Sequence, residues 1–415
     1  MRQSRLKTMV LLLAGAAVSA QAGWVPARRP SVAAKDSGHM ILPFYFDVPG
    51  IGAGYGLIGD LTNAFGTKAD LVGASFWGDA KGQAIALYDY DLIPDRLEMN
   101  IQGFHLQDTT YQAYFQRGTD SPKDNYVLAE MPSDWIGEVS LTASFWERRL
   151  QSLWGISRDR YTVGALRDHG GNVILRARNP TPVKIDSAKW GLRVDLTDDE
   201  QNPHKGLLVE PGLTHTPRHR LAPAILHADL SVSAYTPVGR GNVWVVNAFR
   251  SDVHTRKKGV SDIAAVGREA GFDCSSLTDP GDLAACQDYL QSLADANEHG
   301  AATPLGGTSR LRSFADGRFQ GAHTEFIGTE WRWNLSSEVR SFDVGVLKDV
   351  RTALQIAFFY ELGTVADHRR DLWESTRFTY GAGVRLVTVS GFAYRLDFAQ
   401  GREGFQPVIF FQYPW

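Results

Sequence analysis

From residue 51 to the end of the chain, apolar and polar residues alternate with a period of two, which is the spacing of a β-strand. The clearest runs cover residues 190–197, 226–235, 355–362 and 394–399, and in each run one face is apolar while the other carries charged, hydroxyl or glycine residues. Candidate strands of about 9–11 residues cross a bilayer when tilted, whereas a soluble β-sandwich uses strands of about 5–6 residues. Aromatic residues near strand ends suit the interfacial girdles of a barrel: Trp331, Trp333, Tyr360, Tyr394, Tyr413 and Trp415. The pattern favours an all-β, transmembrane antiparallel β-barrel over the alternative of a soluble β-domain.

The N-terminus predicts export. A basic start is followed by an apolar run from Met9 to Val18 and by Ala20-Gln21-Ala22, a small-residue cleavage site, so residues 1–22 are interpreted as a signal peptide. The alternative is a membrane anchor, but the run is shorter than the ~20 residues of a spanning helix. The net charge of −3 becomes −6 once Arg2, Arg5 and Lys7 are removed. That balance argues against nucleic acid as a partner, because there is no face-wide basic excess to neutralise phosphates.

Sixteen candidate strands can be placed, an even number as expected for a bacterial barrel. They start near Ile51, Ala69, Ala84, Leu97, Glu138, Leu150, Val173, Trp190, Leu207, Leu226, Val243, Glu325, Ala353, Phe378, Gly391 and Pro407. The barrel is thus expected over residues 51–415, preceded by a short periplasmic tail or plug over residues 23–50.

One long extracellular loop is expected over residues 251–324. Within it, Asp279-Pro280 can begin a small helix, since Asp is a good N-cap and Pro suits the first turn. In an oxidising compartment Cys274 and Cys286 can form a disulfide that ties this helix down. The alternative is two free buried thiols.

The last hundred residues resemble the bacterial surface antigen family, the barrel of the BamA/TamA-type outer-membrane assembly factors and of two-partner-secretion transporters. Four motifs carry the resemblance, in order: Leu311-Arg312-Ser313-Phe314 with Gly317-Arg318-Phe319, then Glu330-Trp331-Arg332, then residues 358–364, then residues 381–386 with 394–399. Ser313 and Glu361 depart from the Gly and Asp of the family pattern. The resemblance implies a sixteen-strand barrel whose long loop folds into the lumen. Residues 23–50 are too few for a POTRA domain, which indicates a short, POTRA-less branch.

The resemblance also implies a lock on the loop. Arg312 is expected to pair with Glu361 and Asp397 inside the lumen, with Phe314 and Gly317 completing the loop motif. Alternation places three further charged residues, Glu330, Arg332 and Arg395, on the same lumenal face. The alternative is that these are solvated charges lining a pore.

Two features concern closure of the barrel. Gly52, Gly54 and Gly56 on the expected first strand, and Gly404 and Pro407 on the last, predict a weakly paired seam, which in the family opens sideways. The alternative is that the glycines face a crowded lumen. Phe411, Tyr413 and Trp415, on one face with Ile409, resemble a C-terminal signal for the insertion of barrels. Their other interpretation is simply lipid-facing residues and girdle.

No enzyme motif is found: the sequence contains neither a G-x-S-x-G elbow nor an H-E-x-x-H helix, and no cofactor, metal or catalytic residue is expected. The expected function is translocation or insertion of a polypeptide at the outer membrane of a Gram-negative bacterium. Outer-membrane lipid, a polypeptide client and a separate periplasmic partner are the expected partners. The alternatives are a passive pore or structural barrel and, less favoured, a barrel-embedded hydrolase.

Overall fold

A computed structural model describes residues 25–27, 38–200, 202–239, 241–335, 340–344, 347–388 and 393–415. The predicted signal peptide over residues 1–22 and the predicted strand start at Gly391 lie outside the described residues. Within these ranges, no helix is long and apolar enough to span a membrane.

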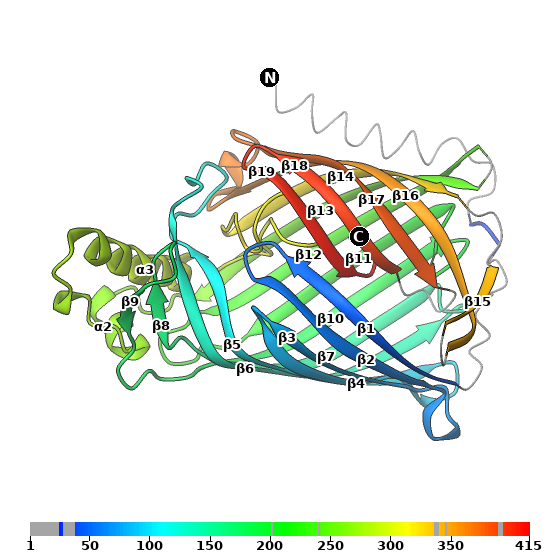
Figure 1. The fold of residues 1–415 in the computed structure, drawn as a ribbon, viewed down its shortest axis with the longest axis horizontal. Helices are drawn as coiled ribbons and strands as arrows, with labels where there is room; N and C mark the ends of the chain where they lie inside the picture. The colour runs from blue at the N-terminus through cyan, green and yellow to red at the C-terminus, as the bar shows by residue number, and fades with distance from the viewer. Residues whose placement is uncertain are drawn as a thin grey trace.

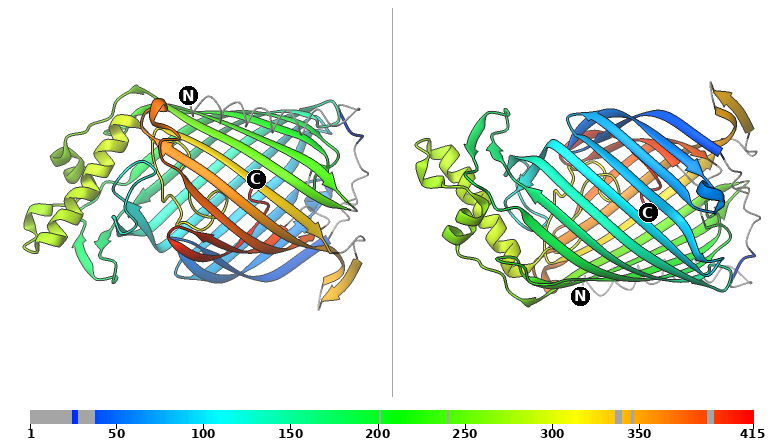
Figure 2. Two further views of the ribbon diagram at one scale, coloured as in Figure 1. Left: turned by 90° about the horizontal axis from the view of Figure 1, so that it is seen from above. Right: turned by 90° about the horizontal axis from the view of Figure 1, so that it is seen from below.

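Sixteen antiparallel strands form a closed barrel with strongly tilted strands (Figures 1 and 2). Each strand pairs with the next along the chain, apart from β7 with β10 and β14 with β16, and β1 pairs with β19 to close the ring. The barrel strands are β1 (Gly38–Val48), β2 (Gly52–Thr62), β3 (Asp70–Gly78), β4 (Lys81–Ile93), β5 (Leu97–Tyr114), β6 (Tyr126–Phe145), β7 (Leu150–Thr162), β10 (Val183–Thr197), β11 (Gly206–Thr216), β12 (Ala224–Val238), β13 (Asn242–Lys257), β14 (His323–Asn334), β16 (Leu347–Ala366), β17 (Arg377–Thr388), β18 (Ala393–Gly401) and β19 (Gly404–Phe411). Three shorter strands lie outside the ring: β8 (Ala165–Arg167), β9 (Val173–Arg176) and β15 (Arg340–Val344).

The expected total of sixteen barrel strands is confirmed, but two of the assignments behind it are wrong. Residues 38–48, assigned to a periplasmic tail or plug, form β1, so the barrel begins at Gly38 and not at residue 51. The strand expected from Val173 is β9, part of a short hairpin with β8. The two errors cancel in the count. β1 escaped notice because its run of Phe44, Tyr45 and Phe46 breaks the alternation.

Burial follows the alternation of the sequence, and β14 shows it most clearly. Its even-numbered residues from Thr324 to Arg332 are buried toward the lumen, whereas Trp331 and Trp333 are exposed on the outer face. An outward apolar face with aromatic residues is what contact with lipid requires. We name the two faces of the wall inward and outward.

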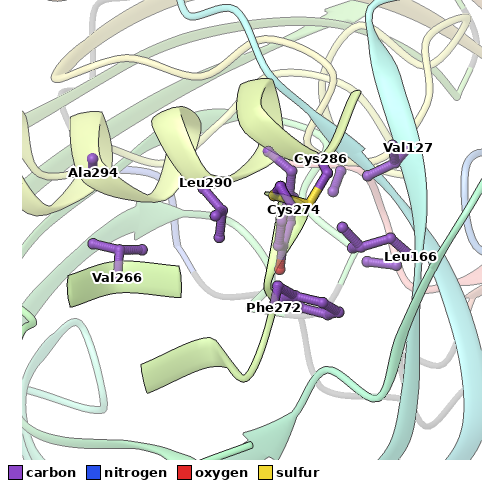
Figure 3. Packing of buried hydrophobic residues seen from close by; sticks show 11 residues of the cluster. Val127, Leu166, Val266, Phe272, Cys274, Cys286, Leu290 and Ala294 are labelled. Carbon is purple, nitrogen blue, oxygen red and sulfur yellow. A yellow bond between two sulfur atoms is a disulfide. The ribbon is translucent and has the colours of Figure 1, made fainter. Parts of the chain in front are cut away.

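A small apolar core, seen from close by in Figure 3, lies beyond one end of the barrel, where Figure 1 shows α2 (Ile263–Ala270), α3 (Pro280–His299), β8 and β9. It joins α2 and α3 to Val127 of β6 and Leu166 of β8, since β5 and β6 are 18 and 20 residues long and extend past the other strands. Because long loops of such barrels face outward, the end of the barrel that carries this apolar core is taken as extracellular. We name the apolar core the extracellular core.

Short 3-10 turns cover Ala64–Gly66, Cys274–Ser276 and Arg369–Asp371.

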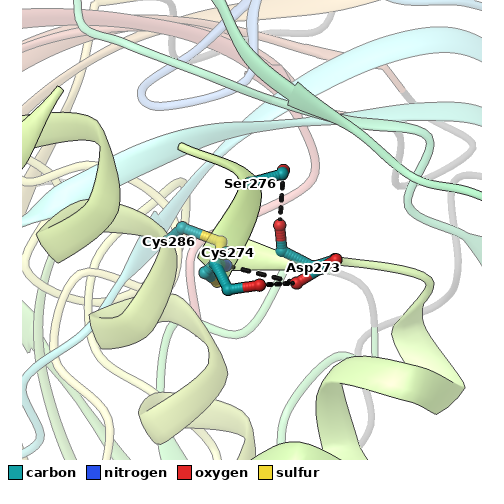
Figure 4. Close-up of a disulfide and its surroundings, with 5 residues drawn as sticks. Asp273, Cys274, Ser276 and Cys286 are labelled. Atoms are coloured by element: carbon teal, nitrogen blue, oxygen red, sulfur yellow. Dashed lines mark hydrogen bonds between the residues drawn. A yellow bond between two sulfur atoms is a disulfide. The ribbon is translucent and has the colours of Figure 1, made fainter. Parts of the chain in front are cut away.

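The expected helix and disulfide are both present. Asp279 accepts hydrogen bonds from the backbone N–H groups of Gly281 and Asp282, and Pro280 begins α3. Cys274 is bonded to Cys286, with Asp273 capping the turn that holds Cys274 (Figure 4). The disulfide therefore joins this turn to α3 within the extracellular core.

Candidate functional site

The chain between α3 and β14, residues 301–322, lies within the outline of the barrel in the three ribbon views (yellow in Figures 1 and 2). We name it the inner segment. Its backbone pairs with itself between Leu305 and Phe319, and Leu305, Leu311, Phe314 and Phe319 are buried against inward residues of β13, β14 and β16. One hydrogen bond, from the backbone N–H of Asp316 to the carbonyl oxygen of Pro49, also joins it to the β1–β2 turn. The inner segment is thus fixed to strands around the ring.

Arg312 is the centre of the contacts that hold the inner segment. Its Nε lies 2.8 Å from Oε1 of Glu361 on β16, and its backbone N–H donates to the other oxygen of the same carboxylate at 3.0 Å. Its Nη1 lies 2.6 Å from Oδ2 of Asp397 on β18, and its Nη2 lies 3.5 Å from Glu330 on β14. None of these four side chains is exposed. One guanidinium therefore links the inner segment to three separate strands.

Three more arginines complete the buried cluster. Arg332 and Arg385 both donate to the carboxylate of Glu330, the first at 2.7 Å, and Arg395 pairs with Asp397. Arg395 also donates to the backbone carbonyl oxygen of Thr308, in the inner segment. The cluster holds four arginines and three carboxylates, so it is not a line of solvated charges. Burial of this kind requires each charge to be paired, because an isolated ion in a dry site is very costly.

The local sequence makes room for these groups. Gly383 of β17 faces the carboxylate of Asp397, and a Cβ at that position would lie 2.0 Å from Oδ1. A Cβ on Gly363 of β16 would lie 2.5 Å from Cδ1 of Leu305. The glycines of these strands therefore leave space that the inner segment and its ion pairs fill.

The surroundings shift the pKa values of Arg312 and of the nearby Arg310 in opposite directions. Burial by itself lowers the pKa of Arg312, but Glu361, Asp397 and Glu330 outweigh burial and raise that pKa above its usual value. Arg310 has no carboxylate within ion-pair distance among the described residues and stacks at 3.6 Å over Phe249. Burial lowers the pKa of Arg310 to about 10. Of these two arginines, Arg312 is the one held by buried carboxylates.

The rest of the loop motif supports the same attachment. Phe314 packs edge-on against Phe319 at 5.0 Å, and Gly317 adopts a positive φ of 64° in the turn that follows. Ser313, which stands where the family pattern has Gly, lies 2.7 Å from the hydroxyl of Thr379 on β17. The two departures from the pattern, Ser313 and Glu361, are therefore both used for contacts.

The seam lies between β1 and β19, and the prediction of its first strand was wrong. Gly54 and Gly56 are on β2, where a Cβ would lie 2.5 Å from the ring of Phe46 and 2.8 Å from the ring of Phe44. Gly52 stands opposite Val48 at the β1–β2 turn. These glycines accommodate an inward aromatic cluster, which was the alternative interpretation.

β19 does carry Gly404 and Pro407, and its pairing with β1 is short. Among the described residues, the seam has one registered pair, Asp47 with Ile409, whereas the next-shortest ladder of the wall, β3 with β4, has seven. Because β19 ends at Phe411, this register leaves the β1 residues 38–44 with no β19 residue opposite. The contacts across the seam are largely side-chain ones: Phe411 against Phe44 at 5.3 Å, and the Tyr394 hydroxyl donating to the Tyr45 carbonyl oxygen.

The C-terminal aromatic residues do not all face lipid, as the girdle interpretation requires. The chain turns at Gln412, with φ 69°, and carries Tyr413 and Trp415 into the lumen. Arg332 lies 4.1 Å from the ring centre of Tyr413, and Trp415 packs on Gly328, where a Cβ would lie 2.8 Å from its ring. The placement of Tyr413 and Trp415 in a lipid-facing girdle is therefore wrong, because the strand ends before them and a residue with positive φ redirects the chain.

Several residues that hold the same site were not expected from the sequence. Arg385 follows Gly383 in a motif that was noted, yet its contact with Glu330 was not expected. Arg318 is fully buried and bonds to Glu403 of the β18–β19 turn at 2.8 Å and to Ser121. The alternation of charge on inward faces was a usable signal for Arg385. No sequence signal connects Arg318 with a residue 85 positions away.

No protein-family model and no curated protein matches the chain. Among solved structures, it is similar to CdiB from Escherichia coli, at 11% identity over 89% of this chain and 63% of that chain, with a TM-score of 0.51. It also aligns with BamA from Haemophilus ducreyi lacking POTRA domains 1–3 (11% identity, 94% and 75% coverage, TM-score 0.48) and with CdiB from Acinetobacter baumannii (11%, 89% and 59%, TM-score 0.46). The chain thus spans less than two thirds of either CdiB. At this identity the comparison shows the fold alone: the chain is a closed sixteen-strand antiparallel β-barrel whose fold is similar to that of CdiB.

Proposed function

We propose that this barrel passes or inserts a polypeptide at the outer membrane, and that the client engages the seam between β1 and β19. The observation that carries the proposal is the edge of β1 over residues 38–44, which has no β19 residue opposite it among the described residues. An unpaired strand edge presents backbone N–H and C=O groups in a row and pairs readily with another strand. A client strand can add there without breaking an existing ladder of the wall.

The buried cluster around Arg312 supports the proposal in a second way. A barrel whose wall contains a weakly paired seam needs its lumen closed, or solutes would leak across the membrane when that seam opens. The inner segment, fixed to β14, β16 and β18, supplies that closure in our proposal. We also propose that a separate periplasmic partner delivers the client to the seam.

The test joins the two seam strands covalently. Asp47→Cys with Ile409→Cys places two thiols on directly opposed residues, within the Cα distance that a disulfide spans. Both natural cysteines are already bonded to each other, so no other thiol competes. The matched control, Leu42→Cys with Ile58→Cys, locks an opposed pair in the β1–β2 ladder instead.

The readout is quantitative proteomics of outer-membrane and secreted fractions from cells without the gene, complemented by each variant. We expect deletion to remove one or a few proteins, the wild type and the control pair to restore them, and the seam pair to restore them only under reducing conditions. Full restoration by the oxidised seam pair would overturn the role of the seam. An unchanged proteome on deletion would overturn translocation or insertion altogether.

A further inference from the structure

The outward faces of β5, β6, β7 and β10 carry an ordered set of residues that neither the inner segment nor the seam uses (cyan to green strands in Figure 2, right). Strand register aligns His105, Trp135, Arg160 and Lys184 in one row toward the extracellular end. His105 and Trp135 stack with ring centres 4.9 Å apart. Trp135 is 55% exposed, so this row stands at the surface of the wall.

The next row toward the periplasm forms a hollow. It aligns Gly103, Gly137, Arg158 and Asp186. A Cβ on Gly137 would meet no atom within 4 Å, and one on Gly103 would meet only Ile85, at 3.8 Å. Two adjacent strands thus leave an unfilled strip on the outer face, directly below the aromatic pair.

Apolar residues border the hollow on the periplasmic side. The third row aligns Ile101, Val139, Ile156 and Ala188, and Ile156 is 65% exposed. All residues of the two lower rows except Gly103 line a groove of about 700 Å³, and His215 and Pro217 line it at the β11 side. The groove is apolar at its lower end and bounded by charged groups at its upper end.

The charges at the upper end are unbalanced. Arg158 pairs with Asp186 at 2.6 Å, but Arg160 and Lys184, which are directly opposite each other, have no carboxylate within ion-pair distance among the described residues. Three cations and one anion therefore sit side by side above an apolar groove. That order, cation above and hydrocarbon surface below, matches a lipid with an anionic headgroup.

We propose that this groove binds a phosphorylated glycolipid of the outer leaflet, of the lipid A class. Its phosphate contacts Arg160, Lys184 and Arg158, and one acyl chain lies over Gly137 against Ile156. The extracellular core marks the upper end as the outer-leaflet side, where such glycolipids are found. The groove lies away from the seam and the inner segment, so this inference stands independently of the proposed function.

The test measures binding of bis-phosphorylated lipid A to the full-length barrel in detergent by native mass spectrometry. Removing both unpaired cations, Arg160→Gln with Lys184→Gln, is expected to weaken binding about thirty-fold, because each surface cation contributes roughly 1 kcal/mol toward an anionic lipid. Gly137→Leu fills the strip and is expected to weaken binding without changing charge. Matched controls are Arg256→Gln, an exposed cation of β13, and Gly73→Leu, an equally open outward glycine on β3.

Folding of every variant is checked by the heat-dependent shift in gel mobility that folded barrels show. Dephosphorylated lipid A should bind the wild type as weakly as the phosphorylated form binds the double variant. Equal binding of phosphorylated and dephosphorylated lipid would overturn the headgroup contact, and wild-type affinity in Gly137→Leu would overturn the acyl-chain contact. Equal affinity for phosphatidylglycerol would overturn the choice of a glycolipid.

Discussion

Removing the side chain of Arg312 should release the inner segment while leaving the barrel wall intact. Arg312→Ala deprives Glu361 of the guanidinium that pairs with it and removes one of the two arginines at Asp397. All of these groups are fully buried, so water does not replace the lost contacts. Breaking one partner of a buried ion pair costs about 3–5 kcal/mol, mainly because the remaining charge is left unpaired.

That cost changes the ratio of held to released inner segment by about two to three and a half orders of magnitude. The wild-type barrel should show low conductance in planar bilayers if the inner segment closes the lumen as we propose, and Arg312→Ala should show long openings of higher conductance. In parallel, an extracellular protease should cut residues 301–322 faster in the variant. Arg312→Lys should behave in between, since Lys keeps the charge and loses the forked geometry.

Arg310→Ala is the matched control. It removes a second arginine from the same segment, but one that stacks on Phe249 and holds no carboxylate among the described residues, so about 0.5–2 kcal/mol is lost. If Arg312→Ala leaves both conductance and cleavage at wild-type levels, the inner segment is held by its other contacts and not by the ion pairs of Arg312. Equal effects of Arg310→Ala and Arg312→Ala would likewise refute a specific role for the ion pairs.

Three further predictions concern other parts of the molecule. Cys274→Ser should destabilise the extracellular core by about 2–3 kcal/mol and expose α3 to protease, while heat-dependent gel mobility of the barrel stays unchanged. Gly54→Val should lower the unfolding temperature of the barrel, because the new Cβ meets the ring of Phe46 and overpacking costs about 1–3 kcal/mol; an unchanged temperature would mean that β1 shifts freely. Burial raises the pKa of Asp367, but the guanidinium of Arg117, 2.7 Å away, outweighs burial and holds that pKa below its usual value. The ion pair therefore stabilises the fold at pH values above about 4, the pKa of the unfolded chain. That stabilisation is lost as the pH falls through the lower pKa of the folded state. Asp367 also accepts a hydrogen bond from the backbone N–H of Ala322 in the inner segment, so proteolysis of residues 301–322 should rise in that acidic range, and Asp367→Asn should remove most of this pH dependence.

Much of the wall could be predicted from the sequence, because alternation is a local signal. It placed the starts of β5 and β7 at the observed residues, Leu97 and Leu150, and that of β11 one residue late. The signal failed at β1, where consecutive aromatic residues hide the period. It also failed at β9, where an alternating stretch lies beyond the membrane. Strand length and position relative to the bilayer are properties of the folded barrel, which a local period does not report.

The site was predictable in part for a similar reason. Arg312 and its expected carboxylates, Glu361 and Asp397, were found through a motif that spans loop and strands, and the structure brings them together. The contact of Tyr413 with Arg332 could not be predicted from the sequence, because a single backbone angle at Gln412 decides which way the last residues point. No alternation pattern encodes such a reversal.

The strand lengths bear on the lipid around the protein as much as on the protein itself. At about 3.4 Å per residue and a tilt of about 40°, the 8 residues of β19 rise about 20 Å, whereas the 20 residues of β6 rise about 50 Å. The apolar band of an outer-membrane barrel is about 25 Å tall. The bilayer beside β19 therefore has to thin, or the barrel has to lean, and either response strains the lipid at a fraction of a kcal/mol per Å. Lipid order is then lowest along the seam, so the membrane is easiest to breach where the wall is least paired.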